Sequence, residues 1–283
     1  MLVNLKEILQ LAEKSRIAIG AYNTPNLETL MAVLGKAEKN DVPVIIMHGE
    51  AHESIIPLDV IGPIMVSMAG KSSVPVCVHC DHGESLDYLR RALDLGFTSI
   101  MYDGSSLPYE NNVMNTLKAV WMAREYSASV EAEIGVVGGH EAGAVYASVQ
   151  EYTDPELARQ FVEETGIHAL ACSFGTVHGF YAEEPKLDFD RIRKIKELTN
   201  LPLVMHGGSG VSHEDYLKSI ECGIRKINYY SYMSRIGVKS AQKQIETGGA
   251  KYYHDVVFAA TNSMAEDVDK SMQVFYKLEK GTL

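Results

Sequence analysis

Three histidines stand where predicted strands end, each beside glycine residues: His82, His178 and His206. Neutral imidazoles suit Zn²⁺, and three of them leave one coordination position open for a substrate, which is typical of catalytic zinc sites. A single histidine at a strand end is more often a hydrogen-bonded core residue, but three of them favour a metal site. The remaining histidines are interpreted as structural, although His48 also ends a predicted strand: His48, His52, His79, His140, His168, His213 and His254.

Two carboxylates could exchange protons with a substrate. Asp81 follows an apolar run and directly precedes His82, and Glu141 lies in a glycine-rich loop at 135–143. Separate carboxylates suit separate proton transfers. The alternative for Asp81 is a buried partner that orients His79 or His82. For Glu141 the alternative is a solvent-exposed charge on the loop, which is the favoured interpretation when the other candidate residues are left aside.

A glycine-rich turn at 207–210 follows the seventh predicted strand and precedes a helix that we expect to begin near Ser212. In barrels of alternating strands and helices, backbone N–H groups at this position often bind phosphate. Asn228 and Ser231, after the eighth strand, could complete such a site. Glycine also serves any tight turn, so it is the position of the turn that predicts phosphate binding.

These side chains need a scaffold that brings several strand ends to one rim. Eight apolar segments predict strands at 17–22, 42–47, 74–78, 99–102, 128–134, 169–174, 202–206 and 226–229. Helical segments separate them, which favours a (β/α)₈ TIM barrel with additional N- and C-terminal helices over a doubly wound sheet. A barrel of this length commonly forms one domain, so we expect residues 1–283 to be a single domain.

Three further segments carry structural predictions. Asp154 and Pro155 have the residue types of a helix N-cap and first helical position. The loop at 135–143 is too glycine-rich for regular structure and long enough to form a mobile lid. The tail at 252–278 has an apolar stripe at helical spacing, which indicates that it packs on the barrel or joins subunits.

Composition excludes several classes of partner. The formal net charge is −11, and no basic run is present, which argues against nucleic acid and anionic membranes as partners. The N-terminus lacks the pattern of a signal peptide and no apolar run approaches a bilayer span, so we expect a cytoplasmic protein. The four cysteines lie in apolar surroundings and are interpreted as reduced core thiols: Cys77, Cys80, Cys172 and Cys222.

Across nearly its whole length, the sequence resembles the class II zinc-dependent aldolases that act on fructose or tagatose bisphosphate and related ketose phosphates. The motifs that carry the resemblance are Asp81-His82-Gly83, Asp103-Gly104-Ser105, Val130-Glu131-Ala132-Glu133, Gly138-Gly139-His140-Glu141, Tyr152-Thr153-Asp154-Pro155, Gly175-Thr176-Val177-His178-Gly179, His206-Gly207-Gly208-Ser209-Gly210 and Lys226-Ile227-Asn228. So many motifs in order are specific for the family.

The resemblance implies a role for each candidate residue. His82, His178 and His206 would hold zinc, with Glu133 as a supporting or alternative ligand. Asp81 would exchange a proton with the substrate hydroxyl, and Glu141 would take the proton from carbon. The candidate phosphate-binding residues, with Na⁺ or K⁺ as a further ligand of the site, are Asn23, Gly179, Gly207, Gly208, Ser209, Asn228 and Ser231.

The sequence departs from the family on one side of the site. The family usually has a serine near the end of the second strand, where this chain has residues 48–50, His-Gly-Glu. Ser231 and Tyr232 stand where the family usually has a threonine and an acidic residue. No basic residue is an evident anchor for a second phosphate, and Arg235 is the only candidate we weighed.

The resemblance therefore implies a carbohydrate-metabolic lyase. The expected reaction is reversible, zinc-dependent aldol cleavage of a ketose 1-phosphate or 1,6-bisphosphate, as in glycolysis, giving dihydroxyacetone phosphate and an aldehyde. The alternatives are a zinc hydrolase, which lacks its usual HxH and bridging lysine here, and a non-catalytic sugar-phosphate-binding protein. The resemblance and the apolar tail imply a homodimer or homotetramer.

Overall fold

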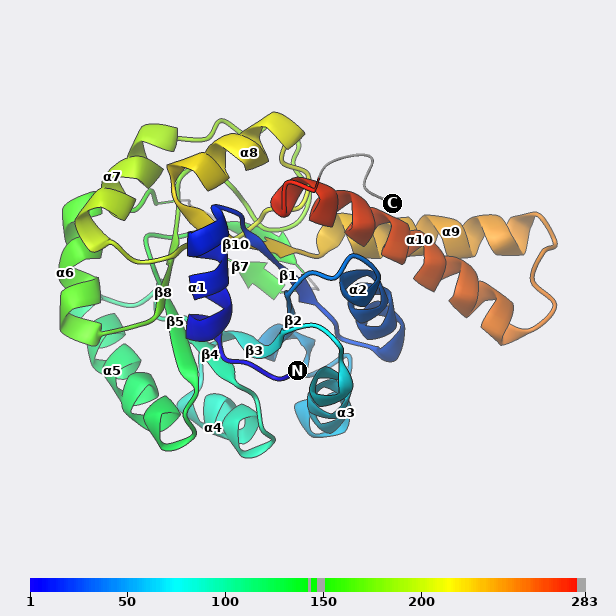
Figure 1. Ribbon diagram of the computed structural model, residues 1–283, viewed down its shortest axis with the longest axis horizontal. Coiled ribbons are helices and arrows are strands. Elements are labelled where there is room, and N and C mark those ends of the chain that lie inside the picture. The colour runs from blue at the N-terminus through cyan, green and yellow to red at the C-terminus, as the bar shows by residue number, and fades with distance from the viewer. Residues whose placement is uncertain (142–143, 147–150, 279–283) are drawn as a thin grey trace.

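Eight parallel strands close into a barrel in the order β1-β10-β9-β8-β5-β4-β3-β2 (Figure 1). The computed structural model describes residues 1–141, 144–146 and 151–278, without the side chains of 140, 141 and 144–146. The barrel strands are β1 (Ile19–Asn23), β2 (Val44–Gly49), β3 (Val76–Gly83), β4 (Ser99–Tyr102), β5 (Ser129–Ile134), β8 (Ala169–Cys172), β9 (Leu203–Met205) and β10 (Ile224–Tyr229). The TIM-barrel prediction is confirmed, because β1 pairs with both β10 and β2.

Helices surround the barrel, and two of them begin where the sequence predicts. They are α1 (Leu5–Ser15), α2 (Leu27–Lys39), the 3₁₀ helix η1 (Glu50–His52), α3 (Leu58–Lys71), α4 (Leu86–Asp94), α5 (Tyr109–Glu125), α6 (Pro155–Thr165), α7 (Phe189–Thr199), α8 (His213–Cys222), α9 (Ser231–Glu246) and α10 (Tyr253–Phe275). The Asp154 carboxylate accepts two backbone N–H groups at the start of α6. The Ser212 hydroxyl accepts the N–H of Asp215 at the start of α8.

Helix α1 closes the barrel at the N-terminal ends of its strands. Its apolar face is buried through Leu5, Ile8, Leu9 and Ala12. The preceding residues reach the first residue of β3, where the N–H of Val3 donates to the carbonyl of Val76. This end is therefore sealed, which leaves the C-terminal ends of the strands as the open mouth.

The glycine-rich loop contains regular structure, which corrects the prediction for 135–143. Strand β6 (Gly139–Glu141) pairs antiparallel with β7 (Ala144–Tyr146). The ribbon is fixed to the barrel mouth because the N–H of His178 donates to the carbonyl of Gly138 at 2.8 Å. Gly139 has a φ of 121°, and a Cβ there would lie 2.3 Å from the His178 carbonyl oxygen. Glycine thus permits a close approach here, although a glycine-rich sequence more often indicates an irregular loop.

Helices α9 and α10 form an antiparallel arm that projects from the barrel (Figure 1). The inner part of α10 packs against α2, α8 and β1, and buries the stripe Met264, Val268, Met272 and Phe275. The outer part leaves large apolar side chains exposed, such as Phe258 at 58%. Within the described residues, no helix is long and apolar enough to span a membrane.

Candidate active site

An irregularity in β3 turns two consecutive side chains toward the barrel mouth. The pairing of β3 with β4 shifts register between Cys80 and Gly83, and His82 has a φ of 44°. Consecutive side chains of a regular strand point to opposite faces, whereas a bulge re-aims one of them. Asp81 and His82 are consequently both buried at the mouth, with exposed fractions of 3% and 6%.

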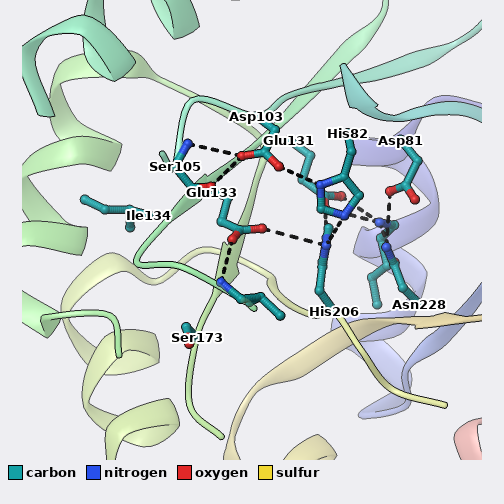
Figure 2. Close-up of polar contacts among 12 residues, drawn as sticks. Asp81, His82, Asp103, Ser105, Glu131, Glu133, Ile134, Ser173, His206 and Asn228 are labelled. Atoms are coloured by element: carbon teal, nitrogen blue, oxygen red, sulfur yellow. Dashed lines mark hydrogen bonds and ion pairs between the residues drawn. The ribbon is translucent and has the colours of Figure 1, made fainter. Parts of the chain in front are cut away.

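The three predicted histidine ligands converge. Nε2 of His82 and Nδ1 of His206 lie 2.8 Å apart, and Figure 2 shows their rings pointing toward each other. The His178 ring centroid lies 4.9 Å from that of His82 and 5.6 Å from that of His206. One nitrogen from each ring falls within 4.8 Å of the others. The structure therefore brings together imidazoles from β3, from the segment after β8 and from the end of β9.

Carboxylates behind the rings fix which nitrogen of two histidines faces this space. Asp103 Oδ2 bonds Nδ1 of His82 at 2.7 Å, and Glu131 Oε1 bonds Nε2 of His206 at 2.9 Å (Figure 2). Carboxylates of this kind orient metal-binding histidines and set their tautomer. Both residues lie in motifs that carry the family resemblance, but these roles were not evident from the sequence. The spacing of Glu131 and Glu133 on one strand was the available signal, because residues two apart share a face.

Glu133 lies beside the three histidines, and only one of its two carboxylate oxygens is hydrogen-bonded within the described residues. Its Oε1 accepts the N–H of Val137 at 3.2 Å, whereas Oε2 has no hydrogen-bond partner among the described residues and lies 3.7 Å from His206 Nδ1. Burial and the nearby Asp103 raise the pKa of Glu133 well above its ordinary value. His82, Asp103 and Glu133 also form a second group with metal-ligand spacing. Three imidazoles and an unpartnered buried carboxylate oxygen fit a divalent cation.

Asp81 is held by two amide groups and does not orient a histidine. Asn23 Nδ2 donates to its Oδ2 and Asn228 Nδ2 to its Oδ1, both at 3.2 Å. Burial would raise the pKa of Asp81, but His82, Lys226 and two further histidines nearby hold it well below the ordinary carboxyl value. The alternative interpretation of Asp81 as a histidine partner is therefore wrong. Asp103 bonds His82, and Ser99 bonds His79.

Six of the seven predicted phosphate-binding residues line one small pocket at the barrel mouth: Asn23, Gly179, Gly207, Ser209, Asn228 and Ser231, together with Tyr229 and Tyr230. Gly208 does not line it. The N–H of Gly208 donates to the carbonyl of Asn228, and its own carbonyl accepts the Tyr216 hydroxyl. The turn is held in shape where the Tyr181 hydroxyl donates to the Gly207 carbonyl at 2.7 Å.

Three other predictions have different outcomes. The Glu141 side chain lies outside the described residues, although the strand that carries it leaves the barrel beside His178. Arg235 is exposed, and its guanidinium lies over the Phe180 ring, 4.8 Å from the centroid. All four cysteines are buried and free of disulfides, as predicted.

Two histidines near β2 differ in their bonding. His48 has both ring nitrogens bonded, Nδ1 with the Tyr88 hydroxyl at 2.9 Å and Nε2 with the Ile56 carbonyl at 3.1 Å. This bonding matches the structural interpretation of His48. His52 is 3% exposed, yet neither ring nitrogen has a hydrogen-bond partner among the described residues. Its ring instead lies edge-on to Tyr230, with 5.4 Å between centroids. Sequence reasoning missed this difference.

Comparisons with known proteins place these features in a family. The profile of the family described as "Fructose-bisphosphate aldolase class-II" matches residues 3–280. The fructose-bisphosphate aldolase of Geobacillus stearothermophilus is 40% identical over 232 residues, 80% of each chain. The 6-phospho-5-dehydro-2-deoxy-D-gluconate aldolase of Halalkalibacterium halodurans is 35% identical over 280 residues, 97% of this chain and 96% of its own. The crystal structure of the YdjI aldolase from Escherichia coli K12 superposes with a TM-score of 0.87 at 31% identity, covering 97% of both chains.

Proposed function

Because the chain belongs to the class-II fructose-bisphosphate aldolase family and is an aldolase, we propose that it cleaves a ketose 1-phosphate or 1,6-bisphosphate reversibly and with zinc. The products are dihydroxyacetone phosphate and an aldehyde. The names of its relatives cover more than one sugar phosphate, so the proposal is kept at the level of this substrate class.

The observation that carries the proposal is the convergence of three buried imidazoles beside an ionised, amide-held Asp81 and a glycine-lined pocket. His82, His178 and His206 would hold the metal, and Glu133 would support it. Zinc bound there would act as a Lewis acid on the ketone carbonyl. The pocket would hold the donor phosphate through backbone N–H groups and the Ser209 hydroxyl, with Na⁺ or K⁺ as a further candidate ligand.

The residues of the chain would move two protons. In the cleavage direction, Asp81 takes the proton of the substrate hydroxyl as that carbon becomes an aldehyde and the carbon–carbon bond breaks. The bonding electron pair goes to the three-carbon donor fragment. An acid then protonates that fragment at carbon, the role that the family resemblance implies for Glu141. Condensation reverses both transfers.

Proton exchange into dihydroxyacetone phosphate tests the donor half alone. The zinc-loaded protein is incubated with this compound in D₂O, and loss of its carbon-bound proton is followed by NMR. We expect exchange in the wild type, none after chelation, recovery with added zinc, and none in Glu141→Gln. Absence of exchange in protein with bound zinc would reject the proposed reaction and leave hydrolysis or sugar-phosphate binding to be assayed.

The remaining assignments concern the whole protein. We propose a single domain, because the barrel with its helices, the ribbon of β6 and β7 and the arm account for all described elements. We also propose a location in the cytoplasm, as the sequence leads us to expect. We also propose a homodimer or homotetramer in which the arm contacts a second copy. Val238, Ile245 and Phe258 are more than half exposed on this arm, at 55%, 61% and 58%. Exposed apolar surface of this kind is typical of subunit contacts.

A further inference from the structure

Lys226 is a fully buried lysine whose ammonium group joins two parts of the candidate site. Its Nζ lies 2.9 Å from Glu131 Oε2 and donates to Asn228 Oδ1 at 2.8 Å. Lys226 and Asn228 are two residues apart on β10, so their side chains share one face of the strand. Glu131 comes from β5, which does not neighbour β10 in the barrel. The contact therefore crosses the interior.

We propose that Lys226 is a positioning residue that fixes both the candidate metal ligand His206 and the candidate acid–base Asp81, an inference that rests on the proposed function. Lys226 donates to neither group and bonds Glu131 and Asn228 instead. Glu131 connects the lysine to His206, and Asn228 connects it to Asp81.

The first connection sets which His206 nitrogen faces the metal. Glu131 accepts a hydrogen bond from Nε2 of His206 at 2.9 Å, which leaves Nδ1 directed at His82. The Lys226 ammonium lies against the same carboxylate, 2.9 Å from Oε2, and offsets its charge inside the barrel. Without the lysine, an uncompensated carboxylate would be buried at this position.

The second connection sets the orientation of an amide. The two ends of an asparagine amide have the same shape, and only hydrogen bonds decide which end faces a neighbour. A lysine ammonium donates and never accepts. Lys226 therefore holds Oδ1 of Asn228 and turns Nδ2 toward Asp81, where it donates at 3.2 Å. The reversed amide would aim an oxygen at an ionised carboxylate.

Stability alone does not account for this arrangement. Replacing a buried ion pair by apolar groups is often neutral or stabilising, whereas removing one partner destabilises by about 3–5 kcal/mol. This asymmetry gives a way to separate the effect of Lys226 on stability from its effect on the positions of His206 and Asp81. Lys226→Met leaves the Glu131 charge alone, whereas Lys226→Met/Glu131→Gln removes both charges and keeps the side chains close to their native size.

The test measures metal affinity and thermal unfolding before any turnover. We expect Lys226→Met to lower Tm and to weaken zinc binding, measured by competition with a chelator, about 10–100-fold. The double variant should recover Tm but not zinc affinity. Lys196→Met, which removes a partly buried lysine paired with Glu13 away from the barrel mouth, is the control and should bind zinc like the wild type.

Turnover at saturating zinc then tests the connection to Asp81. We expect kcat of the double variant to stay at least about tenfold below wild type with KM little changed, because the misdirected amide affects Asp81 and leaves the phosphate pocket intact. A double variant with wild-type Tm, zinc Kd and kcat would overturn the proposal. If the wild type binds zinc but cleaves no sugar phosphate, the proposed function fails, while the zinc measurement still decides the role of Lys226 toward His206.

Discussion

The two sides of the barrel mouth are built differently. On the side of β5, β9 and β10, Glu131, His206 and Lys226 are fully buried and joined by contacts of 2.9 Å. On the side of η1 and the start of α9, His52 is 3% exposed and has no hydrogen-bond partner among the described residues. An unpaired buried polar group costs about 1–3 kcal/mol. His206 is therefore fixed by a bond to a carboxylate, whereas His52 is held by packing against Tyr230.

The comparison coincides with the departures noted in the sequence. The family resemblance rests on the candidate metal-ligand motifs and their supporting carboxylates, whereas the departures lie at the end of β2 and after β10. The proposed reaction needs fixed geometry, because small errors in the orientation of reacting groups are costly.

The largest expected effect comes from Asp81, which Asn228 of β10 connects to the first side. Asp81→Asn keeps the size of the side chain but cannot take the hydroxyl proton, so cleavage should fall by about 10²–10⁴ in kcat. Exchange of the dihydroxyacetone phosphate proton in D₂O should persist, since Asp81 acts on the other fragment. A variant that loses both activities equally would place Asp81 in the donor half and break the assignment.

His52 should make the second side sensitive to acid. Burial, followed by the effect of His48, lowers the pKa of His52 from 6.5 to about 4. Between these values the unfolded chain binds a proton that the folded chain does not, so stability is full above pH 6.5 and falls as the pH decreases toward 4. The linkage amounts to roughly 3 kcal/mol. His52→Phe should remove this part of the pH dependence in urea unfolding from pH 7 to 4.5.

The exposed His254 supplies the control for this prediction, since its side chain is 61% exposed. In His254→Gln, the loss of stability that His52 causes between pH 6.5 and 4 should remain. An acid limb of equal steepness in wild type and His52→Phe would show that other groups titrate there and that His52 is not strained by burial.

The phosphate pocket should respond least. Gly207 has a φ of 62°, and a Cβ there would lie 2.3 Å from the Val177 carbonyl oxygen. Gly207→Ala must shift the turn that carries Ser209, so we expect KM for the sugar phosphate to rise about tenfold with a smaller change in kcat, equivalent to about 1.4 kcal/mol. Ser212→Ala, which removes a helix cap outside the pocket, should lower stability without changing KM. Equal KM in Gly207→Ala and wild type would show that this turn does not bind the phosphate.

Much of the architecture could be predicted from sequence because it depends on local patterns. Alternating strands and helices, the caps at Asp154 and Ser212, and histidines beside glycines all leave signals within a few residues. The ribbon of β6 and β7 was missed because its glycines permit close packing against His178, which only the folded chain reveals. The bonding of Glu131 to His206 and Lys226 was missed because the three residues lie far apart in sequence and meet only in the folded chain.

The distinction between His48 and His52 was equally hidden. His48 lies near the end of β2 and His52 in η1 directly after it, and only the positions of Tyr88 and Ile56 decide that His48 is bonded. Residue type singled out the three candidate metal-ligand histidines because imidazole is a common zinc ligand. It could not rank the structural histidines, because their roles depend on what packs against them.

The bulge in β3 has a consequence for how the chain can change over generations. Asp81 and His82 are adjacent in sequence, and a regular ladder would send one of them toward the helices. The left-handed backbone conformation of His82 costs about 1–3 kcal/mol, and the surrounding barrel holds the residue in it. Deleting or inserting a single residue between Val76 and Gly83 would turn side chains that face the barrel interior toward the helices, and the reverse. Point substitutions can therefore be tolerated at the rim of the barrel, whereas a change in the length of β3 cannot.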